Sequence, residues 1–111
     1  MANKHARIAS LIQRNISDII LFELKKPIMK LVTVNACVVS NDFSVAKVYI
    51  SHLEHDKIHT ALDELNRAKG AIRTLLSKRL DIYKVPELIF IIDDTYDRFE
   101  RIEELLSKVN K

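Results

Sequence analysis

The sequence has very few of the residues that break or reverse regular secondary structure. Its 111 residues include one glycine and two prolines. Sandwiches and barrels of many strands need frequent turns, and turns depend heavily on glycine and proline. Helices with a few strands are therefore expected. A single glycine also excludes the phosphate-binding loops of Walker and dinucleotide-binding folds, because each of these loops needs several glycines.

Cysteine and long apolar runs are also scarce. Cys37 is the only cysteine, so no disulfide can form within the chain, and the composition fits a reducing compartment. Residues 1–15 lack the apolar segment of a signal peptide, and no apolar run approaches the roughly 18 residues of a membrane helix. We therefore expect one cytoplasmic domain over residues 1–111 that does not bind membranes. A monomer is expected, although the sequence carries no direct sign of oligomeric state.

Aromatic residues and catalytic motifs are sparse. The chain has no tryptophan, and its four phenylalanines and three tyrosines are scattered. They do not form the paired stacking positions of an RRM or the groove of an OB-fold. A Gly-x-Ser-x-Gly motif is absent, and Cys37 has no evident base beside it in the sequence. No enzyme and no cofactor are predicted.

Two groups of residues keep a metal-dependent alternative open. His55 and His59 would share one helical face, and Asp93, Asp94 and Asp97 follow an apolar segment where magnesium ligands can lie. The glutamate of the metalloprotease pattern is missing, and such acids more often mark a strand exit or a helix cap. We predict no metal site. The alternative is a metal-dependent hydrolase that uses Asp93, Asp94 and Asp97 with a histidine. Loss of catalytic turnover on addition of a chelator would support it.

Hydrophobic periodicity predicts the elements of the first half. Apolar residues at spacings of three and four predict a helix over residues 4–25, which Pro27 ends. β-Branched residues predict strands over 31–39 and 45–53, and the turn residues between them predict a hairpin. Cys37 lies within the first of these strands, where a small buried side chain is expected.

The second half is predicted to hold two helical segments, a strand and a last helix. Asp56 is expected to cap a helix that ends near Ala68, and a further helical segment follows Gly70. Residues 85–92 read as a strand with Pro86 at its beginning, and it is apolar enough from Leu88 to be covered on both faces. A last helix is expected over about 97–110, capped by Asp97. The predicted fold class is α+β, with a three-stranded sheet covered by helices.

The only glycine lies within a basic stretch. Glycine in a helix interior costs about 1 kcal/mol relative to alanine, so Ala68-Lys69-Gly70 is interpreted as a joint between two helices. The net charge is +3, and six of the fifteen acids lie in residues 93–111, so the basic excess lies in the body. Such clustered charge favours a polyanionic partner, although a merely solubilising face is the alternative. Between Asn66 and Lys84, Asp81 is the only acid, and the bases are Arg67, Lys69, Arg73, Lys78, Arg79 and Lys84.

The element order helix-strand-strand-helix-helix-strand resembles that of a type II KH domain. In KH domains a Gly-x-x-Gly loop between two helices clamps the nucleic-acid backbone. The stretch Ala68-Lys69-Gly70 cannot supply two glycines, and in this it resembles the ribosome-binding factor A family, where an Ala-x-Gly kink replaces the loop. Residues 42–50, Ile72-Arg73, and 85–90 followed by Asp93 resemble further signatures of that family. The resemblance covers about residues 7–109.

The resemblance implies a non-catalytic factor that binds the small (30S) ribosomal subunit and its 16S rRNA during late maturation. It also implies help with 16S rRNA 5′-end processing and with growth in the cold. Residues 94–98 depart from the family, which tends to have a glycine after the position of Asp93, and the chain ends soon after the expected last helix. A generic KH-type protein acting on other RNAs is the alternative.

The predicted RNA contacts lie on both sides of the joint. Counting helical phase from Ala68 places Arg73 and Lys78 outward, whereas Arg79 falls near the apolar stripe and would extend from its rim. Such contacts are mainly to phosphates and read shape more than sequence. The candidate residues are Arg67, Lys69, Gly70, Arg73, Lys78 and Arg79, extended by Arg7 and Arg14 of the first helix.

Overall fold

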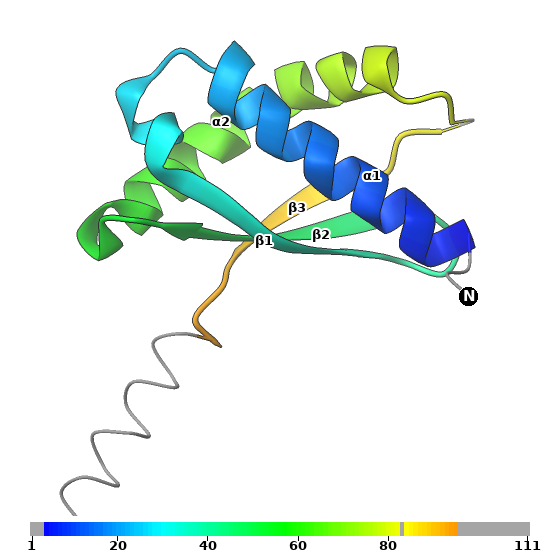
Figure 1. Cartoon of the computed structure of the whole chain (residues 1–111), viewed down its shortest axis with the longest axis horizontal. Helices are drawn as coiled ribbons and strands as arrows, with labels where there is room; N and C mark the ends of the chain where they lie inside the picture. The colour runs from blue at the N-terminus through cyan, green and yellow to red at the C-terminus, as the bar shows by residue number, and fades with distance from the viewer. Residues whose placement is uncertain (1–3, 83, 96–111) are drawn as a thin grey trace, which may run out of the picture.

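The computed structural model describes residues 4–82 and 84–95 (Figure 1). Helix α1 spans Lys4–Asp18 and continues as one π-helical turn, Ile19–Glu23. A 3-10 turn at Pro27–Leu31 leads into strand β1, Val32–Val39, and then strand β2, Val45–His52. A second 3-10 turn, His55–Lys57, precedes helix α2, Ile58–Arg79, and strand β3, Glu87–Ile92, follows. The predicted order of helix, hairpin, helical region and third strand is confirmed.

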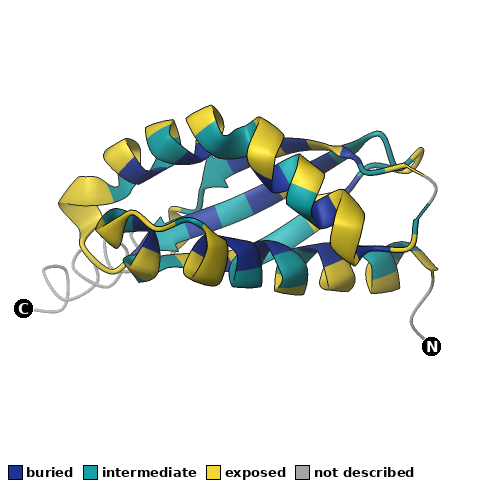
Figure 2. Ribbon diagram, turned by 90° about the horizontal axis from the view of Figure 1, so that it is seen from above, coloured by how far each residue is buried: buried dark blue, intermediate teal, exposed yellow. Residues whose placement is uncertain are grey.

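The three strands form one sheet in the order β1-β2-β3. β2 pairs antiparallel with β1 and parallel with β3, where Ala46 lies opposite Leu88. α1 and α2 lie side by side over the same face of the sheet (Figure 2). The core fills the space between them, and Ile12, Ile16, Leu65, Ile72, Leu76, Val48, Ile50 and Leu88 are all 0% exposed. This is the predicted α+β fold of the type II KH class.

The two predicted helical segments around Gly70 are one helix. α2 is helical without a break from Ile58 to Arg79, so the predicted end of one helix near Ala68 and the start of another after Gly70 are wrong. Burial explains the continuity, because Leu65 on one side of Gly70 and Ile72 and Leu76 on the other all pack into the same core. Figure 1 shows α2 changing direction along its length while it remains helical. The Thr74 hydroxyl donates to the Gly70 carbonyl over 3.1 Å, a bond of the kind that bends helices.

Two further expectations about local structure are wrong. Asp56 does not cap α2, because it lies within the 3-10 turn and Lys57 occupies the N-cap without a side-chain bond. β3 is not covered on both faces, because its residues alternate between exposed and buried and Ile89 is 37% exposed. In the described residues both helices lie on one face of the sheet, so alternate β3 side chains point away from the core. The helix predicted for about 97–110, with its cap Asp97, lies outside the described residues.

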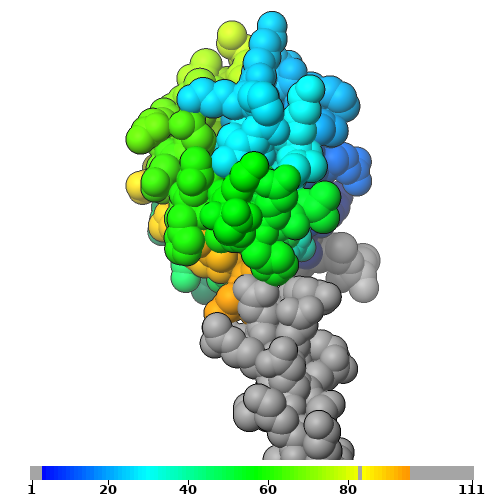
Figure 3. Space-filling model, turned by 90° about the vertical axis from the view of Figure 1, so that its left-hand side faces the viewer, coloured from blue at the N-terminus to red at the C-terminus, as the bar shows by residue number. Residues whose placement is uncertain are grey.

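A buried histidine closes the end of the sheet where β2 stops. His52 is 5% exposed; its Nε2 lies 3.0 Å from the Ile28 carbonyl oxygen, and the Glu54 N–H donates to its Nδ1 over 2.9 Å. Nearby, the Leu53 N–H donates to the Leu31 carbonyl over 3.0 Å. The segment after α1 and the segment after β2, cyan and green in Figure 3, therefore pack side by side at this end of the molecule.

We expect His52→Ala to lower the free energy of unfolding by about 2–3 kcal/mol, because it removes a buried side chain and leaves the part-buried Ile28 carbonyl and Glu54 N–H without their partner. Urea unfolding measures the change. His59→Ala, at an exposed position on α2, is the matched control and should change stability by less than about 0.5 kcal/mol. Equal effects of the two substitutions would contradict this role for His52.

Candidate nucleic-acid interface

Three of the predicted contact residues meet in one hollow, which we call the basic hollow. Lys69, Gly70 and Arg73 lie on the flank of α2 that faces the β1–β2 turn and the connection from α2 to β3. The hollow measures about 490 Å³ and is lined by Ser44, Val45, Lys69, Gly70, Arg73, Lys84 and Glu87. Three cations against one acid give it a positive potential, which suits a phosphate.

Arg73 has a structural bond as well as a place in the hollow. Its Nη2 donates to the Val85 carbonyl over 2.8 Å, and the residue is half-buried. A guanidinium carries five N–H donors, so this one bond leaves others for a ligand. Arg73 therefore fixes the entry to β3 against α2 and adds charge to the hollow. The sequence predicted that it would point outward and gave no sign of its carbonyl partner.

Gly70 has no partner in the protein that requires a glycine. Its φ is not positive, and a Cβ atom built on it would meet nothing within 4 Å outside its own helix. It is exposed at the mouth of the basic hollow. The glycine therefore lowers the stability of α2, and no packing contact explains why it is there. The free space above the backbone suits the close approach of another molecule.

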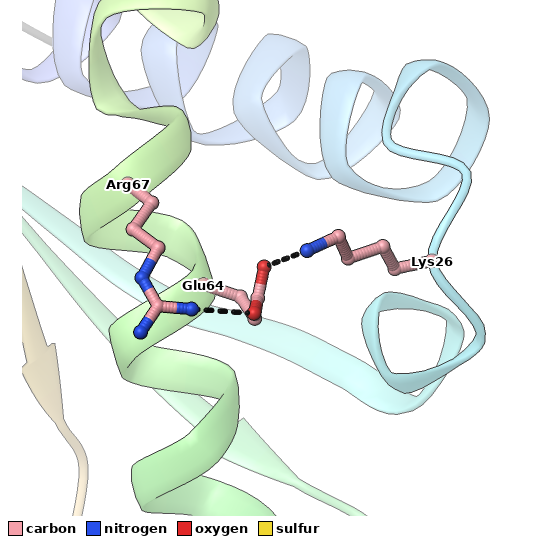
Figure 4. A network of polar contacts seen from close by, with 3 residues as sticks. All are labelled: Lys26, Glu64 and Arg67. Atoms are coloured by element: carbon pink, nitrogen blue, oxygen red, sulfur yellow. Dashed lines mark hydrogen bonds and ion pairs between the residues drawn. The ribbon is translucent and has the colours of Figure 1, made fainter.

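Arg67 belongs to a separate polar network. Glu64 accepts from Lys26 with one oxygen and from Arg67 with the other, over 3.0 Å for Arg67 (Figure 4). The hydrogen bond from Lys26 is the main reason why the pKa of Glu64 is lowered, so the carboxylate stays ionised at neutral pH. Lys26 comes from the loop after α1, 38 residues away in sequence, and was not among the predicted contact residues.

The remaining predicted cations lie apart from the basic hollow. Arg79 Nη2 pairs with Glu23 Oε1 at 3.3 Å, and its side chain is 32% exposed, in keeping with a place beside the apolar stripe. Lys78 is exposed on α2, and Arg7 and Arg14 are exposed on α1. Lys84 is the functional candidate that sequence reasoning missed, although it stands in the same basic stretch. Its place in the hollow follows from the fold of the connection after α2.

The histidines considered for metal chemistry do not share one helical face. His55 lies in the 3-10 turn before α2, whereas His59 lies in α2 itself. Asp93 Oδ2 accepts from Asn35 over 2.8 Å, and its Oδ1 accepts from the Thr95 hydroxyl over 2.6 Å, as suits a strand exit. Over residues 4–82 and 84–95 no three histidine, cysteine or acidic side chains are grouped as a metal would require.

None of the helices described there is long and apolar enough to cross a membrane.

We expect Gly70→Ala to stabilise the chain by about 0.5–1 kcal/mol and to weaken RNA binding. The gain follows from helix propensity, and the loss follows from a methyl group placed where the partner's backbone would approach. Urea unfolding and RNA titration measure the two effects. Ala71→Gly, at the exposed neighbouring position, is the reciprocal control and should destabilise by a similar amount. Tighter or unchanged RNA binding by Gly70→Ala would remove the glycine from the interface.

We expect Glu64→Gln to raise affinity for a structured RNA and to steepen its salt dependence. The substitution releases Lys26 and Arg67 from the carboxylate that now balances their charge. The folding cost should be small because both cations are largely exposed. Filter binding over a salt series measures affinity and slope. Unchanged values for both would place Arg67 outside the interface.

The chain is similar to known proteins of one family. The family model described as ribosome-binding factor A matches residues 4–106. A ribosome-binding factor A from Ureaplasma urealyticum serovar 10 is 37% identical over 113 aligned positions, which cover 100% of this chain and 97% of the relative.

Two structural comparisons support the same assignment. The crystal structure of ribosome-binding factor A from Thermus thermophilus has a TM-score of 0.74 and 28% identity, and the match covers 81% of this chain and 97% of that one. A homology model of the Thermus thermophilus factor, fitted into a cryo-EM map of its complex with the 30S subunit, has a TM-score of 0.65 and 29% identity over 77% of this chain and 90% of that one. The chain belongs to the ribosome-binding factor A family.

Proposed function

We propose that this protein is a non-catalytic assembly factor that binds the free 30S ribosomal subunit through its 16S rRNA. The observation that carries the proposal is the coincidence of family membership over residues 4–106 with a cationic hollow beside the family's Ala-x-Gly position. A family relative has been fitted into a 30S complex, which supports the same partner for this chain. Binding takes place in the cytoplasm, and the protein acts as a monomer.

The electrostatics of the basic hollow supports a phosphate contact. Lys69 and Arg73 are half-buried, so their side chains are held in place more firmly than those of fully exposed cations. A phosphate that enters the hollow meets both of them together with Lys84, and the glycine lets it approach the helix backbone. Contacts of this kind read the shape of folded RNA and not its sequence.

The finer role extends the same proposal. By binding late precursors of the small subunit, the protein aids processing of the 5′ end of 16S rRNA, and it supports growth in the cold. A deletion strain should then accumulate unprocessed 16S rRNA at low temperature. Normal processing and growth in such a strain would remove this finer role and would leave subunit binding to be judged separately.

Sedimentation of a lysate on a sucrose gradient tests the partner. The protein should migrate with free 30S subunits and should be absent from 70S particles. Its absence from both fractions would overturn the proposal. Selective binding to short single-stranded messenger or small RNAs, without migration in the 30S fraction, would favour the generic KH-type RNA binder instead.

We expect Lys69→Glu combined with Lys84→Glu to abolish migration with 30S subunits and to reduce the salt slope of rRNA binding by about 1 for each phosphate that the protein no longer binds. These two lysines are chosen because Arg73 also holds the Val85 carbonyl, so its replacement would disturb the fold. The control combines Lys25→Glu with Lys30→Glu, which makes the same change in net charge at exposed positions away from the hollow. Equal losses in both double variants would show that net charge, and not the basic hollow, governs binding.

A further inference from the structure

A second hollow, which we call the apolar hollow, adjoins the basic hollow. It also measures about 490 Å³, and its apolar lining comes from Ile8, Phe43, Ile82 and Pro86. Lys84 lines both hollows. The start of α1, the β1–β2 turn and the connection after α2 meet at one end of the molecule, on the right in Figure 1. The end of the protein that carries the phosphate candidates therefore also carries an open apolar depression.

The wall formed by Phe43 is held in an unusual backbone conformation. Phe43 has a φ of 60°, and in the described residues it is the one non-glycine residue with a positive φ. Glycine and asparagine adopt this conformation readily, whereas a bulky aromatic side chain does so rarely, and such outliers gather at binding sites. The turn could have placed a glycine here at no steric cost. The contacts of the ring with the core and with His5 therefore outweigh the backbone preference at this position.

Neighbouring groups fix the ring in place. The Phe43 ring stacks on His5 with centroids 4.4 Å apart and planes at 27°, and His5 Nε2 lies 2.8 Å from the Val39 carbonyl oxygen. Asp42 Oδ1 accepts from the Ser44 hydroxyl over 2.6 Å and from the Ser40 hydroxyl over 2.8 Å. These bonds lower the pKa of Asp42 to about 2, so the carboxylate that braces the turn stays ionised at physiological pH. The apolar hollow therefore has a preorganised aromatic wall.

We propose that the apolar hollow receives one unpaired nucleobase of the RNA whose phosphate lies in the basic hollow. The inference rests on the proposed function and adds to it the structural class of RNA that is recognised. In a single nucleotide one sugar joins an apolar, flat base to a charged phosphate. An apolar hollow and a cationic hollow that share Lys84 match this arrangement. Proteins that recognise RNA commonly take bases out of the stack and hold them against aromatic side chains.

An apolar side chain of a protein partner is a less suitable occupant. Charged groups surround the apolar lining, with Lys4 and Lys84 beside Asp42 and Asp81. A nucleobase has hydrogen-bonding edges that can meet such groups while its faces contact apolar walls. A leucine or valine side chain could make no polar contact with these charged groups. The mixed lining therefore favours a base.

The test compares two RNA hairpins that differ in one group. One hairpin carries a single bulged adenosine, and the other carries an abasic residue at that place, so both present the same number of phosphates. With the full-length protein at fixed salt, fluorescence anisotropy should show about tenfold tighter binding of the hairpin with the base, a difference of about 1.4 kcal/mol. Equal affinities, including no binding of either hairpin, would overturn the proposal.

Two variants locate the preference. Phe43→Leu keeps an apolar side chain but removes the ring, so we expect the preference to fall below about threefold while binding of the abasic hairpin is unchanged. Ile82→Ser, elsewhere in the lining of the apolar hollow, should have the same effect. It replaces Phe43→Leu in the test if that variant does not fold. The control is Val38→Ser, which removes an apolar side chain that is 53% exposed on the uncovered sheet face, and it should keep the preference. Loss in the control, or a full preference in both test variants, would place the base elsewhere and overturn the proposal.

The hairpin experiment separates this inference from the proposed function. If the protein migrates with 30S subunits but binds the two hairpins equally, only the nucleobase inference fails. If it neither migrates with 30S subunits nor binds either hairpin, both fail. A clear preference for the hairpin with the base, without migration in the 30S fraction, would support the hollow and overturn the ribosomal partner.

Discussion

The burial of the apolar stripe of α2 against the sheet determines where the functional side chains lie. Leu65, Ile72 and Leu76 are fully buried, and this fixes the rotation of the whole helix. At 3.6 residues per turn, Lys69 and Arg73 then fall about 40° and about 80° from Leu65, on the flank beside the β1–β2 turn. Loss of this packing would therefore remove the basic hollow as well as the core.

The same rotation explains why the six cations of the basic stretch do not form one surface. Arg67 and Lys78 fall about 200° and about 220° from Leu65, on the side away from the core. Arg79 falls about 40° from the stripe on the other flank, where it meets Glu23. The cations of α2 therefore lie in three places: in the basic hollow, on the outer face, and on the flank beside Glu23.

The order of elements could be predicted from the sequence because the signals for it are local. β-Branched runs, the turn residues of 40–44 and the position of Pro86 each act within a few residues, and the structure has strands where these patterns place them. The continuity of α2 could not be predicted in this way. The propensity of Gly70 against a helix is about 1 kcal/mol, and the buried leucine and isoleucine residues on both sides outweigh it. The exposure of alternate β3 residues also could not be predicted from local patterns. It arises because, in the described residues, both helices pack on the same face of the sheet.

The partners of the candidate site were also beyond local patterns. The Arg73 bond to Val85 spans 12 residues, and the Glu64 bond to Lys26 spans 38. Neither bond can be predicted from the position of a residue on the helix, so both Arg67 and Arg73 were predicted as RNA contacts. The structure distinguishes them, because Arg67 pairs with the Glu64 carboxylate whereas Arg73 donates to the neutral Val85 carbonyl. Gly70 drew attention in the sequence as the only glycine, yet the fold does not require a glycine there, because a Cβ atom would meet no neighbour within 4 Å.

The two ends of the molecule differ in a way that favours this division of roles. At one end His52 joins the segment after α1 to the end of β2 through buried bonds, which makes that end a structural closure. At the other end the turn at Phe43 and the connection through Lys84 border two open hollows. A glycine that no neighbour requires and an aromatic residue in a conformation that favours glycine both lie there. Each departs from the residue that the local backbone conformation favours, and in opposite directions. Binding of a partner at that end, as proposed above, would account for both.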